Sequence, residues 1–104
     1  MKPSNQSTLT GASRLLQLSP EDNVLIAAGS MLAGSVIKIG GEMLIIRRSV
    51  NMGAKIALYD IDRGEKVIKF GAPIGSATTD IEAGEHVHVH NLASDYIPTR
   101  LSTT

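Results

Sequence analysis

Apolar and polar residues alternate in short runs along most of the chain. The alternation is clear at residues 36–39 and 67–70, and again at 86–91, where Val87 and Val89 lie between histidines. A period of two is typical of a half-buried strand, because successive side chains point to opposite faces. No stretch of sequence carries the apolar period of an amphipathic helix of three turns. The pattern therefore predicts an all-β domain.

Glycines and short polar segments separate these runs. Gly40 and Gly41 are predicted to form a hairpin turn, since glycine adopts positive φ at no steric cost. Ser19 is predicted to cap a single helical turn with Pro20 at its first position. The predicted strands cover residues 15–19, 23–28, 35–39, 42–48, 54–61, 66–71, 74–81 and 86–91.

A short motif is repeated within the chain. The segments 60–67 (DIDRGEKV) and 80–87 (DIEAGEHV) share Asp, Ile, Gly, Glu and Val, and 30–37 (SMLAGSVI) is a looser copy. Each copy predicts a buried apolar residue, a tight turn at the glycine and then a new strand. We expect these turns to be structural corners of a compact clip-like or barrel-like fold, with ligand binding as the alternative.

Composition and charge exclude several classes of function. Ten basic and ten acidic residues cancel, so no long-range field would attract nucleic acid or an anionic membrane surface. Three aromatic residues are too few for a platform that stacks bases. Without cysteine, the chain forms neither disulfides nor thiolate metal sites. The longest apolar stretch, residues 24–34, is too short to span a bilayer.

The chain of 104 residues fits one small domain. We expect that domain to cover residues 15–95, between a flexible N-terminal tail at 1–14 and a C-terminal tail at 96–104. The N-terminal segment is polar and lacks the hydrophobic core of a signal peptide, so a cytoplasmic location is expected. An exposed strand edge in so small a domain would also allow a homo-oligomer to form.

All three histidines of the chain lie within five residues, at His86, His88 and His90. On a strand they would share one face, with Val87 and Val89 packed on the other. Neighbouring imidazoles would lie about 6.5–7 Å apart and the outer pair about 13 Å, so an unbent strand offers a metal only two ligands. A complete site would need a further carboxylate, another histidine or a second chain. The alternative is an ordinary solvent-facing strand.

The remaining candidates for chemistry are carboxylates and lysines. Most of the acidic side chains fall in predicted turns, where solvation is the default interpretation. Lys55 and Lys69 lie within predicted strands and could reach the carboxylate of a substrate, although surface lysines commonly extend into solvent without binding anything. No serine lies in a nucleophile elbow, and no glycine-rich segment has the ending of a phosphate-binding loop.

The sequence from Lys55 onward resembles the small N-terminal domain of the altronate/galactarate dehydratase family, a SAF domain with the β-clip fold. The matching segments are 53–58 (GAKIAL), 67–71 (VIKFG), 74–77 (IGSA) and 83–91 (AGEHVHVHN), and upstream 22–28 (DNVLIAA) is similar to the first strand of the family. The ending His-x-His-x-His-Asn is the most specific of these motifs. The resemblance covers roughly residues 22 to 92 and implies an all-β SAF domain.

The resemblance also implies a lyase activity. Family members remove water from a sugar acid to give a 2-keto-3-deoxy acid, and they depend on Fe2+ or another divalent metal such as Mn2+. A large domain or subunit carries most of the catalytic groups, so this chain would be inactive without its large partner. His86, His88 and His90 would act in catalysis, with His86 and His88 as metal ligands, while Lys55, Lys69 and Asn91 would contact substrate.

Two alternatives follow from the same resemblance. A related branch forms the small subunit of a sulfolactate sulfo-lyase, and other SAF domains are non-catalytic carbohydrate-binding modules. Two positions depart from the family pattern, which has a histidine where this chain has Ala54 and a tyrosine where it has Phe70. These departures predict altered specificity or lost activity. The absence of a large-subunit reading frame beside this one in the genome, together with Ala54, would favour the binding module.

Overall fold

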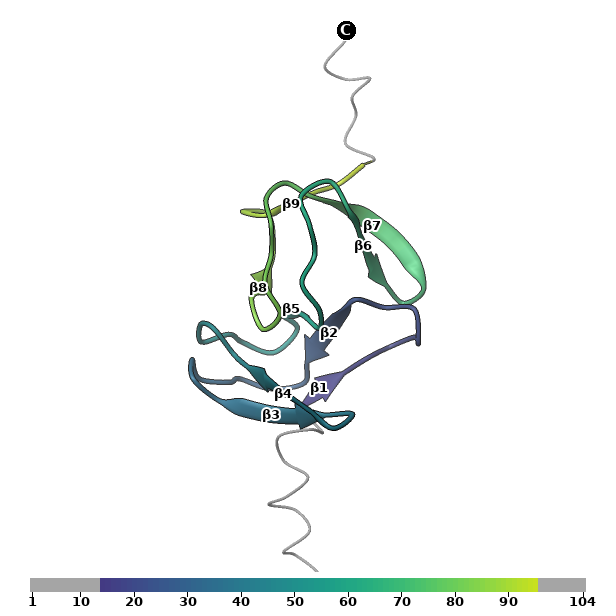
Figure 1. The fold of residues 1–104 in the computed structure, drawn as a ribbon. Helices are drawn as coiled ribbons and strands as arrows, with labels where there is room; N and C mark the ends of the chain where they lie inside the picture. The colour runs from purple at the N-terminus through teal and green to yellow at the C-terminus, as the bar shows by residue number, and fades with distance from the viewer. Residues whose placement is uncertain (1–13, 96–104) are drawn as a thin grey trace, which may run out of the picture.

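A computed structural model describes residues 14–95, so the predicted C-terminal tail at 96–104 and all of the predicted N-terminal tail at 1–14 except Arg14 lie outside the described residues. This part of the chain consists of short strands joined by turns (Figure 1). No helix within residues 14–95 is long and apolar enough to cross a membrane. The strands are β1 (Leu15–Leu16), β2 (Val24–Ala27), β3 (Val36–Ile39), β4 (Glu42–Ile45), β5 (Lys55–Ala57), β6 (Lys66–Lys69), β7 (Ala72–Ala77), β8 (His86–Val87) and β9 (Leu92–Ala93).

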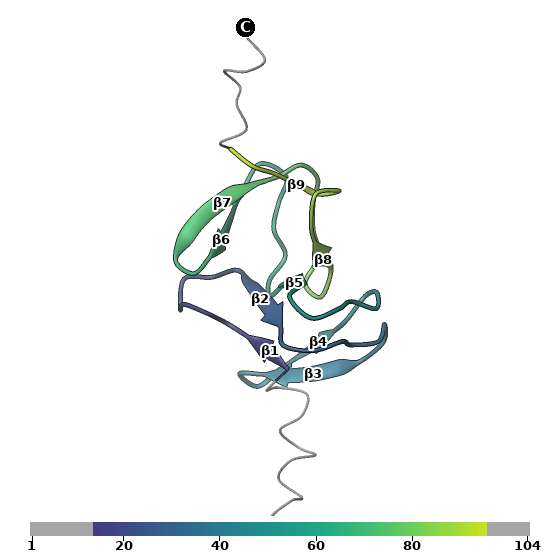
Figure 2. The ribbon, with the colours of Figure 1, turned by 180° about the vertical axis from the view of Figure 1, so that it is seen from behind.

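The strands form three antiparallel sheets. The largest has the order β1-β2-β5-β8, a hairpin pairs β3 with β4, and the third sheet has the order β6-β7-β9. In Figure 1 the β3–β4 hairpin lies below β2 and β5, while β6, β7 and β9 lie above them, and the view from behind in Figure 2 agrees. The prediction of an all-β fold is therefore confirmed.

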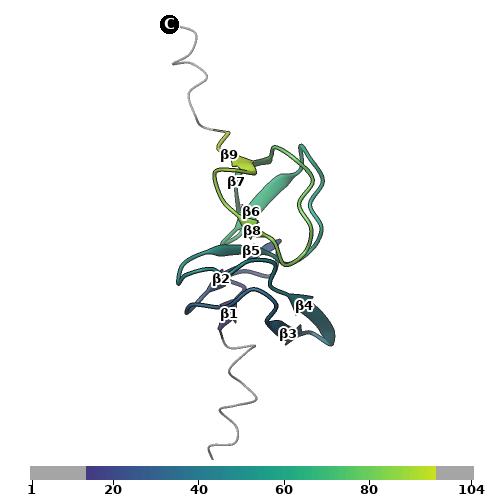
Figure 3. The same cartoon turned by 90° about the vertical axis from the view of Figure 1, so that its left-hand side faces the viewer.

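The central sheet separates two apolar cores because its side chains alternate between its faces. Leu25 of β2 and Ile56 of β5 pack in the core on the side of the β3–β4 hairpin. Their neighbours Val24 and Ala57 pack in the second core, beneath β6 and β7. The side view in Figure 3 shows β2 and β5 between the two layers. The two central strands, β2 and β5, thereby stabilise both halves of the domain.

Four turns of one form build the corners of the fold. In each, a glycine at φ near +90° precedes a new strand by two residues, and its N–H donates to a carbonyl of a neighbouring strand segment at 2.7–2.8 Å. Two reciprocal backbone bridges, Met31–Val50 and Ile61–Ile81, link the turns in pairs. The repeat found in the sequence marked three of these corners, and the fourth, at Gly53, was missed. The four glycines are Gly34, Gly53, Gly64 and Gly84.

The carboxylates of two corners hold the turns together. Asp80 Oδ1 accepts from the backbone N–H of Arg63, and Asp60 Oδ1 accepts from that of Ala83, each at 2.9 Å. Glu65 likewise accepts from the N–H of Asp62 within its own turn. The structural interpretation of the repeat is thus confirmed for these corners.

The two-residue hairpin predicted at Gly40 and Gly41 is present, with φ of +57° and +88°. The β6–β7 hairpin turns in the same way, but its first position holds Phe70 at φ +56°. At the single turn predicted from Ser19 and Pro20, the N–H of Asp22 donates to the carbonyl of Ser19 at 3.0 Å, and the buried Asp22 carboxylate accepts the N–H of Ser19. The chain forms a hydrogen-bonded turn there, and no helix follows it.

Candidate functional site

The three imidazoles gather at a sharp bend. Strand β8 ends at Val87, and residues 88–91 form a turn. The ring of His86 lies 5.4 Å from that of His88, centroid to centroid, in a nearly parallel stack with 8° between the planes. The ring of His90 lies 5.8 Å from His86 at a tilt of 50°. All three rings therefore cluster around His86.

This geometry corrects the prediction of one continuous strand over 86–91. Val89 is 79% exposed and does not pack in the core, whereas Val87 is fully buried. The bend also changes the expected spacing, since His90 turns back to His86 instead of lying two strand repeats away. The turn therefore brings the rings of His86 and His90 together, whereas an extended strand would have kept them apart.

The side chain of Asn91 stabilises this turn through hydrogen bonds to its backbone. It is buried, with 4% of its surface exposed. Its Oδ1 accepts from the backbone N–H of His88, and its Nδ2 donates to the backbone carbonyl of His86, each at 2.9 Å. Asn91 therefore positions the backbone that carries the histidines, while a direct contact with substrate stays a prediction.

Lys55 lies beside the histidines on the neighbouring strand. It begins β5 and pairs with Val87, while the next residue, Ile56, pairs with His86. Partial burial, helped by the charge of Lys69, holds the pKa of Lys55 below its ordinary value. Lys55 and Lys69 therefore lie within electrostatic reach of each other, and binding of substrate by either one stays a prediction.

His86 is surrounded by positive charge. Partial burial lowers its pKa first, and the nearby His88, His90, Arg48 and Lys55 lower it further. A lowered pKa favours the neutral imidazole near pH 7, which can accept a proton. A catalytic role for the neutral His86 imidazole stays a prediction.

Within the part of the chain that the structure describes, two cations near His86, Arg48 and Lys55, take part in no ion pair. The ion pairs found within residues 14–95 join Arg47 to Glu82 at 2.9 Å and Lys66 to Asp95 at 2.6 Å. Arg48, Lys55 and Lys69 take part in neither. Cations without an ion-pair partner attract anions, but Glu85 lines the same hollow as Arg48 and adds a negative charge there. Arg48 was missed in the sequence, where the only signal was a pair of adjacent arginines at the end of a predicted strand.

Two hollows meet at His86. One has a volume of about 270 Å³ and is lined by Arg47, Arg48, Glu85 and His90 as well as His86. The other, also of about 270 Å³, is lined by residues 51–55 together with His86 and His88. His86 thus forms a wall common to both, and each hollow contains one unpaired cation.

The described residues do not form a metal centre by themselves. Within residues 14–95, no three histidine, aspartate or glutamate side chains are arranged to hold a metal ion. The stacked rings of His86 and His88 lie parallel instead of converging. The nearest acidic residue in either hollow, Glu85, accepts a hydrogen bond from the backbone N–H of Glu82. The predicted pair of metal ligands, His86 and His88, would need further ligands from elsewhere.

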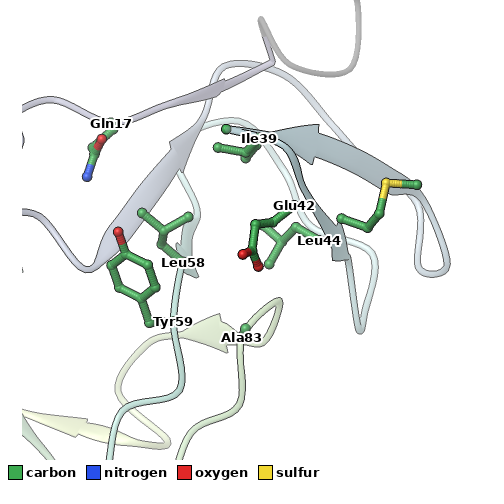
Figure 4. Close-up of a pocket in the computed structure, with 9 residues that line it drawn as sticks. Gln17, Ile39, Glu42, Leu44, Leu58, Tyr59 and Ala83 are labelled. Carbon is green, nitrogen blue, oxygen red and sulfur yellow. The ribbon is translucent and has the colours of Figure 1, made fainter.

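A larger hollow of about 510 Å³ lies apart from these residues, between the β3–β4 hairpin and the segment after β5. Figure 4 shows Gln17 and Tyr59 on one side of it and Ile39, Glu42 and Leu44 on the other. None of the predicted site residues lines it. The three histidines and Lys55 therefore line the two smaller hollows and not this larger one.

Comparison with known proteins decides the family. The altronate/galactarate dehydratase SAF domain family matches residues 13–95, most of the chain. The chain belongs to this family. The resemblance inferred from the sequence motifs is confirmed, and the β-sheet structure is that of a SAF domain.

Relatives of this SAF domain fall into two groups. Altronate dehydratase of Escherichia coli is 44% identical over 70 residues, and that of Bacillus subtilis is 37% identical over 76 residues. These matches cover 67% and 73% of this chain but only 14% and 15% of the dehydratases. The (2R)-sulfolactate sulfo-lyase subunit alpha of Chromohalobacter salexigens is 37% identical over 68 residues, which is 64% of this chain and 72% of that subunit.

Proposed function

We propose that this SAF domain is the small subunit or N-terminal domain of a sugar-acid dehydratase of the altronate/galactarate type, a hydro-lyase that works together with a large catalytic partner. The observation that carries the proposal is the cluster of three imidazoles beside Arg48 and Lys55, two cations that take part in no ion pair found within residues 14–95. A sugar acid is an anion with several hydroxyls, so it complements such a cluster in charge and hydrogen bonding.

The reaction would remove one proton and one hydroxide from the substrate. The C2–H bond breaks as a base takes the proton, a C2=C3 double bond forms, and the C3–O bond breaks with release of water after protonation by an acid. The resulting enol becomes the 2-keto-3-deoxy acid. Neutral His86 suits the base, while His88 or His90 would supply the acid and Lys55 would bind the carboxylate. Lys69 would reinforce Lys55.

The divalent metal, Fe2+ or Mn2+, stays a prediction for the assembled enzyme. Residues 14–95 alone do not form its site, so the large partner would have to supply ligands. The predicted ligands His86 and His88 would bind the metal only in place of the acid and base roles given above, because a neutral imidazole has one acceptor nitrogen. No step above depends on the metal. We propose a cytoplasmic location for the assembly, because its substrates would be metabolites.

The second candidate is the small subunit of a sulfolactate sulfo-lyase, which would expel sulfite instead of water. It is supported by the identity of 37% over 72% of the length of one such subunit alpha. A third, non-catalytic candidate is a carbohydrate-binding module, supported by Ala54 at the position of the family histidine.

Co-expression with a large lyase subunit from the same organism tests these candidates. The purified complex would be assayed with altronate, galactarate and sulfolactate, with ferrous iron added. Formation of a 2-keto-3-deoxy acid is the result that we expect, and release of sulfite would establish the second candidate. A complex that binds substrate without turnover would favour the module, and chains that fail to associate would count against the leading proposal.

A further inference from the structure

The hollow of about 510 Å³ has no part in the proposed reaction. Its walls come from segments far apart in the sequence: the chain between β1 and β2, the β3–β4 hairpin, the segment after β5 and the corner before β8 (Figure 4). Leu44 is buried there, and Ile39, Leu58 and Ala83 are half-buried against the first core. A hollow of this size with a mostly apolar lining is typical of a site for a small molecule.

The polar side chains of this hollow mainly accept hydrogen bonds. Glu42 lines it with a carboxylate that takes part in no ion pair found within residues 14–95. The amide nitrogen of Gln17 donates to the backbone carbonyl of Asp22 at 2.9 Å, which leaves the amide oxygen of Gln17 as an acceptor. Tyr59, which is 59% exposed, adds an aromatic ring and a hydroxyl. The lining therefore suits a ligand that donates hydrogen bonds.

The charge at this hollow is negative. Among the described residues that line it, Glu42 alone is acidic or basic. Arg47 donates to the carbonyl of Ala83, a lining residue, at 3.3 Å, but its guanidinium is paired with Glu82. Lys38 precedes a lining residue on β3, so its side chain points to the opposite face of the hairpin. The carboxylate of Glu42 is therefore left for a cation to bind.

We propose that this hollow binds a small organic cation, in which an ammonium or guanidinium group is joined to an aliphatic chain. Glu42 binds the cationic group, the ring of Tyr59 lies against it, and Leu44 and Leu58 contact the aliphatic chain. Carboxylates and the faces of aromatic rings both attract cations. Figure 4 shows Tyr59 and Glu42 on opposite sides with Leu58 between them, so one ligand can face all three. The inference does not rest on the proposed lyase function.

A titration of the full chain followed by NMR, with probes of matched shape, tests this inference. Pentylamine is the cation, pentan-1-ol the neutral probe and pentanoate the anion. We expect pentylamine to bind with a Kd of about 1–10 mM, since it has few atoms, and about fivefold more tightly than pentan-1-ol. The backbone amide signals of Glu42, Leu58 and Tyr59 should shift, while those of His86 and His88 should not.

Two variants remove the groups that recognise the cation. Glu42→Gln should weaken binding of pentylamine about threefold or more and leave that of pentan-1-ol unchanged. Tyr59→Leu keeps an apolar wall without the ring, and it should weaken binding of pentylamine about twofold or more. Asp62→Asn is the matched control, because it removes an exposed carboxylate that does not line the hollow and should leave the affinity unchanged. Thermal unfolding establishes that each variant is folded.

Several outcomes would overturn the inference. They are equal affinity for the three probes, unchanged affinity in Glu42→Gln, an equal loss in Asp62→Asn, and the absence of saturable shifts with pentylamine. The amide of N-acetyl-lysine, which presents an aliphatic ammonium on a peptide unit, separates a free ligand from a side chain of another protein. We expect it to bind no more tightly than pentylamine. Tighter binding would assign the hollow to a lysine of a partner protein and overturn the proposal of a small ligand.

Discussion

Asn91 and His88 are joined by two hydrogen bonds in opposite directions. The backbone N–H of His88 donates to Oδ1 of Asn91, and the backbone N–H of Asn91 donates to the carbonyl of His88, both at 2.9 Å. In a third hydrogen bond, Nδ2 of Asn91 donates to the backbone carbonyl of His86. The arrangement of the imidazoles therefore depends on one buried amide.

Replacing Asn91 by alanine should destabilise the domain by about 1–3 kcal/mol, because a backbone donor and acceptor lose their partner in a buried place. Urea unfolding measures the loss. In the proton–nitrogen spectrum of the imidazoles, all three rings should also shift. Ser35→Ala is the comparison, since it removes an exposed side-chain bond to a backbone carbonyl and should cost less. An unchanged unfolding midpoint in Asn91→Ala would show that the amide does not hold the turn.

Gly84 and Gly64 occupy equivalent corners at φ +92° and +91°, but their surroundings differ. A Cβ on Gly84 would lie 2.0 Å from the carbonyl oxygen of Ile45, whereas one on Gly64 would meet nothing within 4 Å. Gly64→Ala should cost about 1–2 kcal/mol from backbone strain alone. Gly84→Ala should cost several kcal/mol or prevent folding, because the backbone of β4 has to move. Similar unfolding free energies for the two variants would contradict this packing.

Phe70 is 73% exposed, so its left-handed conformation gains little from packing. Replacing it by asparagine, which tolerates this conformation, should stabilise the domain by about 1 kcal/mol. The reverse change, Gly40→Ala in the matching hairpin, should destabilise it by a similar amount. Chemical unfolding of both variants checks the pair, and a destabilised Phe70→Asn would show that the ring packs against something.

Asp22 makes the stability depend on pH. Burial raises its pKa, but hydrogen bonds from the backbone N–H groups of Gly71, Phe70 and Ser19 outweigh burial and hold the pKa below its ordinary value. A folded-state pKa below the unfolded value of about 4 gives stability that is present above that pH and is lost as pH falls through the folded value.

Asp22→Asn should therefore lower the urea midpoint at pH 7 and flatten its decline between pH 5 and pH 2. The exposed Asp95 provides the control, since its pKa is lowered by the side chains of Lys66 and Ser76 at the domain surface. Asp95→Asn should change the midpoint less. Identical pH profiles for Asp22→Asn and the unmodified chain would rule out this source of stability.

The repeat of apolar residue, glycine and new strand was sufficient to predict the corners at Gly64 and Gly84. The corner at Gly53 has the same geometry, but its segment Val50-Asn51-Met52-Gly53 shares almost no side chains with the other copies. The corner is defined by the backbone hydrogen bond of the glycine, which does not depend on the neighbouring side chains. Sequence identity alone therefore could not reveal it.

The histidine site was predicted in its residues but not in its shape. Alternation over 86–91 favours a strand. The chain turns there instead, and the buried Asn91 bonds the backbone of the turn, which the alternation does not reveal. Arg48 joins the site through the fold, because its segment follows β4 and lies beside the turn that contains Gly84 and Glu85. Such neighbours, nearly forty residues apart, leave no periodic signal in the sequence.

In the assembled lyase, we propose that the imidazole of His86 takes the C2 proton of the acid substrate. The most direct measurement is kcat/KM of the reconstituted complex that contains His86→Ala, compared with the unmodified small chain and with Arg63→Gln. Loss of a general base should lower kcat/KM about 100-fold or more, while the control stays within twofold. A His86→Ala complex with unimpaired turnover would contradict the account.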